Sequence, residues 1–136
     1  MKKIAMIMII ALLTNITGCT EEQKVFDYDL TEASATIVFS QVYDMLVNPD
    51  FYEDKTFKIE GECQFFDHPI TGERLYFVVV MDALGCCPQG IEVMFNDGIQ
   101  APEKFCNVII EGTGATDVEF DYTYLFIDVE DLQVTA

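Results

Sequence analysis

The sequence is poor in positive charge. Its 7 lysine and arginine residues stand against 24 aspartates and glutamates, which gives a formal net charge of −17 at pH 7. A surface of this sign repels phosphate backbones and anionic lipid head groups. From charge alone we therefore expect no nucleic-acid partner, and no basic patch that would bind the chain to a membrane.

Catalytic side chains are scarce as well. The one histidine, His68, lies in a predicted turn beside Pro69, and no serine or cysteine stands near it in sequence to complete a nucleophile–base pair. The sequence also has no glycine-rich phosphate loop. With 24 acidic residues, neighbouring carboxylates arise by chance and identify no acid–base pair. We predict that the protein is not an enzyme.

The N-terminus has no apolar run long enough to span a bilayer. Lys2 and Lys3 precede an apolar stretch over residues 4–13, about half of the ~20 residues that a transmembrane helix needs. A positive start, an apolar centre and small residues before Cys19 instead indicate an export signal over residues 1–18. The end of this signal resembles the lipobox of bacterial lipoproteins, in which the cysteine is acylated and becomes the new N-terminus. The alternative is an ordinary signal peptide with a coincidental cysteine.

Cleavage before Cys19 leaves residues 19–136, enough for one domain that buries a core without relying on disulfides. Residues 19–29 are polar and charged, and we interpret them as the lipidated cysteine and a tether. Residues 30–136 would form the folded domain. We expect acyl chains on Cys19 to hold this domain outside the cytoplasm in the cell envelope, on the plasma membrane or on an outer membrane if there is one.

The hydrophobic pattern predicts one helix followed by five strands. Ala35, Val38, Val42 and Met45 recur with helical spacing, and Asn48-Pro49 ends the helix. Strands are expected over residues 56–66, 75–81, 91–95, 106–113 and 124–134. This order indicates a mainly β fold: a five-stranded OB-fold-like barrel capped by the N-terminal amphipathic α-helix. A β-sandwich is the alternative.

The first pair of domain cysteines falls on two strands that neighbour each other in such a barrel. Cys63 lies near the end of the first strand, and Cys106 opens the fourth. Both have the parity of core residues. They form either a disulfide or two buried free thiols. A metal site that recruits His68 is a third, smaller option.

The second pair, Cys86-Cys87, lies in a predicted turn between the second and third strands. One interpretation is a ligand site for a thiophilic metal, Zn(II) or Cu(I), with Asp82 as a further ligand and Gln89 or Glu92 in support. The hairpin acids Asp117, Glu119 and Asp121 would approach from the same end. A second interpretation is a reducible vicinal disulfide. The third is a tight turn whose thiols only stabilise the fold.

Two stretches of the domain resemble a family of small, uncharacterised bacterial lipoproteins. The first is an NPxxY-like element, here NPDFY over residues 48–52, followed by Lys55-Thr56. The second is a D-A-x-x-C-C-x-Q-G-(I/L)-E turn motif, here DALGCCPQGIE over residues 82–92. The resemblance implies an OB-like domain and assigns no activity.

Together these features predict a membrane-anchored lipoprotein that serves as a non-catalytic binding module, with its candidate metal site at Cys86-Cys87. Two other functions stay open. In one, the cysteines only stabilise the fold and the protein recognises an envelope partner or a small ligand. In the other, it is a thiol redox protein.

Overall fold

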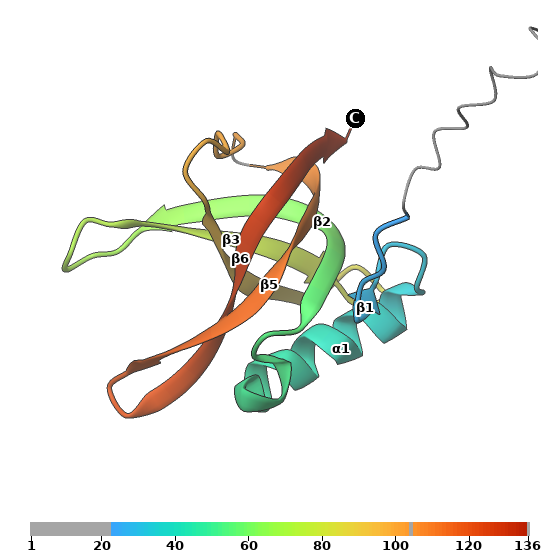
Figure 1. Ribbon diagram of the computed structural model, residues 1–136, viewed down its shortest axis with the longest axis horizontal. Helices are drawn as coiled ribbons and strands as arrows, with labels where there is room; N and C mark the ends of the chain where they lie inside the picture. The colour runs from blue at the N-terminus through green and yellow to red at the C-terminus, as the bar shows by residue number, and fades with distance from the viewer. Residues whose placement is uncertain (1–22, 104, 136) are drawn as a thin grey trace, which may run out of the picture.

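The computed structural model describes residues 23–103 and 105–135. The predicted signal peptide and Cys19 lie outside this range. The elements in chain order are β1 (Tyr28–Asp29), α1 (Ala35–Val47), the 3-10 helix η2 (Pro49–Tyr52), β2 (Thr56–Asp67), β3 (Arg74–Met81), β4 (Pro88–Phe95), β5 (Cys106–Glu119) and β6 (Tyr122–Thr135) (Figure 1).

The strands form one sheet whose ends meet. Its order is β1-β2-β3-β4-β6-β5, and β2 also pairs with β5, which joins the last long strand to the first. All pairs of long strands are antiparallel except β4 and β6, which run parallel. The predicted mainly β, OB-fold-like class is therefore confirmed at this level, and the β-sandwich alternative is wrong because the described strands belong to a single sheet.

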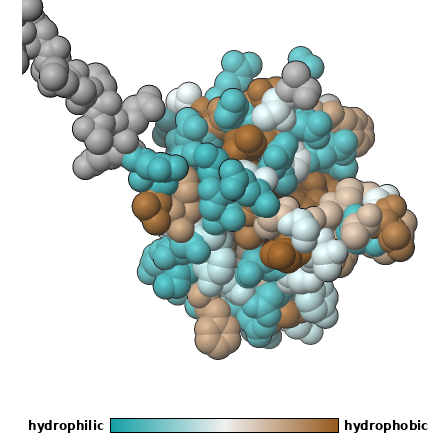
Figure 2. Space-filling view, turned by 90° about the vertical axis from the view of Figure 1, so that its right-hand side faces the viewer, coloured by the Kyte–Doolittle hydropathy of each residue, from teal (hydrophilic) through white to brown (hydrophobic). Residues whose placement is uncertain are grey.

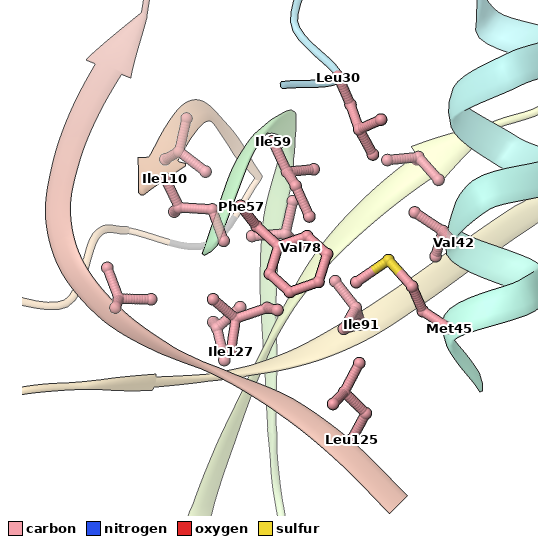
Figure 3. Packing of buried hydrophobic residues seen from close by; sticks show 14 of the residues in the cluster. Leu30, Val42, Met45, Phe57, Ile59, Val78, Ile91, Ile110, Leu125 and Ile127 are labelled. Atoms are coloured by element: carbon pink, nitrogen blue, oxygen red, sulfur yellow. The ribbon is translucent and has the colours of Figure 1, made fainter. Parts of the chain in front are cut away.

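The core follows from the alternation of side chains along each strand, because alternate residues of a strand point to the same face. Phe57, Ile59 and Cys63 of β2 are fully buried, as their spacing predicts. Matching positions on the other strands complete the cluster; they include Val78, Ile91, Val108, Ile110, Leu125, Ile127 and Val129. Figure 3 shows the packing of these buried side chains and labels Phe57, Val78 and Ile127 among them.

Helix α1 adds two fully buried side chains, Val42 and Met45, to this core (Figure 3). The buried stripe is shorter than the sequence pattern predicts, since Ala35, the first residue of the pattern, is exposed. The helix ends at Asn48, as predicted, and Pro49 begins η2 directly. Helix α1 thus meets the sheet through Val42 and Met45, with Val38 partly buried against the same cluster.

A short polar contact joins η2 to α1. The Tyr52 hydroxyl donates a hydrogen bond to Asp44 and accepts one of 2.9 Å from Nε2 of Gln41. Burial, together with the bond to Asp44, raises the pKa of Tyr52 to about 12. The phenol therefore stays protonated and remains a donor at any physiological pH.

Glycines allow a strand to continue where we expected it to stop. We predicted a break after residue 113, but β5 runs on to Glu119. A Cβ at Gly112 would overlap the carbonyl oxygen of Asp128, and one at Gly114 would overlap that of Tyr52. These glycines permit close backbone approach within a strand rather than ending it.

The end of the predicted tether belongs to the folded domain, so the boundary at residue 30 is wrong. Tyr28 and Asp29 form β1, which pairs parallel with β2. The Tyr28 ring stacks on Phe57 with centroids 5.2 Å apart. Asp27 accepts a 2.9 Å hydrogen bond from the Thr56 backbone N–H. The folded part therefore begins several residues earlier than its polar composition suggests.

Figure 2 shows one face of the molecule, on which hydrophilic side chains separate the hydrophobic ones into small areas. This agrees with the strongly acidic composition. Within the described part of the chain, no helix has the length and apolar character needed to cross a membrane.

Candidate metal site in the β3–β4 turn

The turn that carries Cys86 and Cys87 connects two paired strands. Met81 at the end of β3 lies opposite Pro88 at the start of β4. Inside the turn, the Asp82 N–H donates to the carbonyl of Cys87 (3.1 Å) and the Gly85 N–H to that of Asp82 (3.0 Å). Gly85 has φ +68, a conformation that favours glycine. Residues 82–87 are thus held in a closed loop by their own backbone. β4 begins at Pro88, earlier than the predicted start at residue 91.

Asp82 organises this loop with one of its two carboxylate oxygens. Its Oδ1 accepts the backbone N–H of Cys86 at 2.8 Å and that of Cys87 at 3.1 Å. These two bonds lower the pKa of Asp82, because they favour the ionised carboxylate. The second oxygen, Oδ2, faces the Cys86 thiol.

Three candidate ligand atoms converge here. The Sγ atoms of Cys86 and Cys87 are 3.5 Å apart, and Cys86 Sγ lies 3.5 Å from Asp82 Oδ2. One ligand atom from each residue falls within 4.8 Å of the others. Around a tetrahedral zinc ion, ordinary bond lengths place two sulfurs about 3.8 Å apart and a sulfur and an oxygen about 3.5 Å apart. The two 3.5 Å separations lie within a few tenths of an ångström of these values, and the Cys87 sulfur lies within 4.8 Å of the Asp82 carboxylate.

The Cys86 thiol carries its proton in the absence of an ion. Hydrogen bonds with Cys87 and Asp82 raise the pKa of Cys86 above its ordinary value. Both cysteines are exposed, and the nearest charge is the Asp82 carboxylate. A nucleophilic cysteine needs positive charge beside it to stabilise the thiolate. This setting is unfavourable for the redox interpretation and compatible with a metal, which supplies that charge itself.

The predicted supporting residues do not join this group. Glu92 lies further along β4, half-buried, where burial and the nearby Glu119, Glu73 and Asp117 raise its pKa. The hairpin acids therefore gather around Glu92 instead of the cysteines. The pairing of β6 with β4 begins at Phe126, opposite Glu92, so the hairpin that precedes Phe126 lies near Glu92.

Gln89, the other predicted support, has a buried side-chain oxygen, Oε1, with no hydrogen-bond partner among the described residues. It is not one of the three grouped residues. The grouping of Asp82 with the two cysteines was foreseeable, because residues four and five apart meet in a tight turn. The clustering of Glu73 with Asp117 and Glu119 had no signal in the sequence.

The other two cysteines lie directly opposite each other. Cys63 on β2 pairs with Cys106 on β5, and both are free thiols. Cys63 is fully buried, and its burial, with a smaller effect of Cys106, raises its pKa to about 11. Cys106 Sγ donates to the carbonyl of Glu103 at 2.8 Å. In the structure both are free thiols, and Cys106, unlike Cys63, is only partly buried.

His68 is engaged locally in the β2–β3 turn. Its Nδ1 accepts the backbone N–H groups of Ile70 (3.3 Å) and Thr71 (3.2 Å). This turn precedes β3, whereas the Cys86-Cys87 turn follows it. Eight residues of strand, about 25 Å, therefore separate the two turns. In the described chain, His68 is not grouped with any pair of cysteines as a three-ligand set.

Comparison with known proteins adds information on the fold alone. No protein-family model matches the sequence, and no curated protein matches it. Among solved structures, the chain is similar to the N-terminal domain of PriB from Thermoanaerobacter tencongensis, at 17% identity and a TM-score of 0.42 over 60% of this chain and 96% of that one. It is also similar to Rim1 of S. cerevisiae, at 17% identity and a TM-score of 0.43 over 60% and 95%.

These neighbours contradict one of our expectations. Rim1 is described as a mitochondrial single-stranded DNA binding protein. Our exclusion of nucleic acid rested on net charge alone, and it is wrong as an exclusion because a fold of this type serves a DNA-binding protein. The DNA is a ligand of Rim1, and the likeness to this chain concerns the fold.

Proposed function

We propose that this protein is an exported lipoprotein whose OB-like barrel, with α1 over one end, binds a thiophilic metal ion at Asp82, Cys86 and Cys87. The observation that carries this proposal is the meeting of three ligand atoms within 4.8 Å of one another, two of whose separations, at 3.5 Å, suit tetrahedral coordination. Its role is binding, without catalysis. Acyl chains on Cys19 would present the site at the membrane surface.

The competing function is purely structural, with the turn stabilising the fold. It accounts for Oδ1 of Asp82, which accepts two backbone N–H groups. It does not account for the other half of the group, where Oδ2 and two exposed thiols converge. A turn that needed only backbone bonds would not require adjacent cysteines on its surface.

Zinc suits this ligand set better than copper(I). Copper(I) prefers soft sulfur ligands throughout, whereas Zn(II) accepts carboxylate oxygen together with thiolate. The backbone hydrogen bonds also keep the Asp82 carboxylate ionised, which is the form that binds a divalent cation. We therefore expect Zn(II), and Co(II) as its spectroscopic substitute.

Asp82→Asn is the sharpest test of this function. An asparagine keeps the Oδ1 acceptor for the two backbone N–H groups and replaces Oδ2 with an NH₂ group that binds no cation. The turn should survive while zinc affinity falls at least ~10-fold, measured by isothermal titration of the full chain in detergent with a non-thiol reductant. Unchanged zinc affinity in this variant would exclude Asp82 as a ligand.

Two matched double variants separate the cysteine pairs. Cys86→Ser with Cys87→Ser should abolish stoichiometric zinc binding, as read by elemental analysis. Cys63→Ser with Cys106→Ser removes as many thiols and should leave zinc binding intact. If the native protein carries no stoichiometric metal, or if both double variants lose it equally, the metal-binding function is wrong.

Membrane attachment is tested separately at Cys19. The resemblance to small bacterial lipoproteins supports acylation there. Wild-type protein should incorporate labelled fatty acid and partition into the detergent phase, whereas Cys19→Ser should do neither. A wild-type chain that remains in the aqueous phase would contradict the anchor and leave the metal site unaffected.

A further inference from the structure

The candidate site supplies three donors, and tetrahedral zinc takes four. Asp82, Cys86 and Cys87 form the grouped set, and no other His, Cys, Asp or Glu side chain of the described chain joins it. Structural zinc sites are closed by four protein ligands, whereas sites that act on other molecules keep one position open. The fourth position of this site must therefore be filled from outside the turn.

The approach to that position is open. Residues 83–88 are all exposed, and both cysteines are exposed among them. At Gly85, in the middle of the turn, a Cβ would meet no atom within 4 Å. The described chain has no side chain over this part of the loop, so a molecule in solution or a partner's side chain can reach the ion.

Charge selects the kind of donor. One carboxylate and two thiolates carry three negative charges, so a bound divalent ion leaves the site with one net negative charge. A further thiolate or carboxylate would make the site more negative, which is unfavourable on a chain whose net charge is already −17. A neutral imidazole is a good zinc ligand and adds no charge.

The chain cannot provide this imidazole to its own site. Its one histidine, His68, lies at the opposite end of β3, about 25 Å along the strand from the turn. It is also occupied, because Nδ1 accepts two backbone N–H groups. An imidazole ligand has to come from another molecule.

We propose that the metal-loaded turn is a docking site for an external imidazole, which completes the tetrahedron of Asp82, Cys86 and Cys87. The proposal rests on the metal-binding function above. It makes the ion a recognition element: a histidine side chain of a partner binds through the metal, and the acidic surroundings disfavour anionic donors. Free imidazole and a histidine-containing peptide share this chemistry.

The test uses the full chain in detergent, reduced with a phosphine and loaded with one equivalent of Co(II). N-methylimidazole is then titrated while absorption spectra are recorded. We expect a saturable shift of the d–d bands with one imidazole per cobalt, while the thiolate-to-cobalt charge-transfer band persists. The peptide acetyl-Gly-His-Gly-amide should give the same shift, and acetate should give none at equal concentration.

Three controls keep the outcomes distinct. Asp82→Asn loses one donor and should take up two imidazoles per cobalt. His68→Ala should have the wild-type spectrum before titration; a difference would mean that His68 of a second copy already fills the position, which overturns the proposal. With the charge-transfer band present, an absent imidazole shift, or loss of that band on titration, also overturns it. If cobalt gives no charge-transfer band at all, the metal-binding function itself fails.

Discussion

The backbone of Gly114 lies so close to Tyr52 that no side chain fits between them. A Cβ at position 114 would overlap the Tyr52 carbonyl oxygen and lie 3.0 Å from Cε2 of Phe57. This contact holds η2 against β5, and two hydrogen bonds reinforce it: the Asp54 N–H donates to the Gly114 carbonyl (2.9 Å) and the Gly114 N–H to that of Lys55 (2.8 Å). The segment between the helix and the sheet is anchored here.

Gly114→Ala should therefore destabilise the protein strongly. The added methyl group must displace backbone, at a cost of about 2–3 kcal/mol of unfolding free energy. Gly90→Ala is the matched control, because its Cβ would meet neighbours at an ordinary 3.5 Å and its stability should change by less than ~1 kcal/mol. Urea denaturation followed by circular dichroism measures both, and equal effects would contradict the close approach at Gly114.

Tyr52→Phe removes the hydroxyl that links η2 to α1. The variant leaves Asp44 and Gln41 without this partner, so we expect a loss of about 1–2 kcal/mol in unfolding free energy. Tyr43→Phe on the same helix is the control, since Tyr43 is 55% exposed and should be replaceable without measurable change. Thermal or urea unfolding distinguishes the two, and a neutral Tyr52→Phe would show that the polar contact contributes nothing.

Thiol labelling should separate the cysteines by location. With a pKa of about 11, Cys63 has a thiolate fraction near ~10⁻³ at pH 8, and it is fully buried. Iodoacetamide should modify the exposed Cys86 and Cys87 at least ~10-fold faster than Cys63 in the native state. Mass spectrometry of peptides reads the rates, and denatured protein, in which Cys63 becomes accessible, provides the reference. Equal native rates would contradict its burial.

Zinc affinity should fall as the pH is lowered. The raised pKa of Cys86 means that binding must displace a proton even at neutral pH. Titration calorimetry in buffers of different ionisation enthalpy should show proton release on binding, and the affinity should weaken steadily from pH 8 to pH 6. An affinity independent of pH over this range would indicate that thiolates are not the ligands.

Glu92→Gln should stabilise the protein at neutral pH. The raised pKa means that the folded state binds the proton more tightly than the unfolded chain does. The associated stability is fully present below about pH 4 and is lost as the pH rises through the raised pKa. At pH 7 the wild-type protein has lost this stability, whereas Glu92→Gln has no carboxylate to ionise. We expect the unfolding free energy of the variant to be higher by less than ~1 kcal/mol, because water screens the half-exposed carboxylate. Its advantage should disappear near pH 4 in melting experiments, and an advantage that persists there would contradict the proposed cause.

The sequence predicted the elements better than their ends. Alternation of buried side chains identified β2, because Phe57, Ile59 and Cys63 share one face. This alternation does not depend on where the strand begins or ends. The predicted end of β5 at residue 113 was too early, since a glycine that permits close contact, such as Gly114, looks the same in sequence as one that breaks a strand. The Asp82–Cys87 group was predictable because a tight turn brings near neighbours together. The acids around Glu92 come from β5 and from the turn before β3, and their meeting depends on a sheet geometry that no local pattern encodes.

Since Asp82, Cys86 and Cys87 all come from one loop of six consecutive residues, the proposed ligand set is contained in a single short segment. Repacking elsewhere in the protein leaves the donor set together, whereas one deletion inside the loop removes it whole. Grafting these six residues onto another tight hairpin would transfer the same three donors. The donor set therefore depends on the loop and not on the rest of the fold.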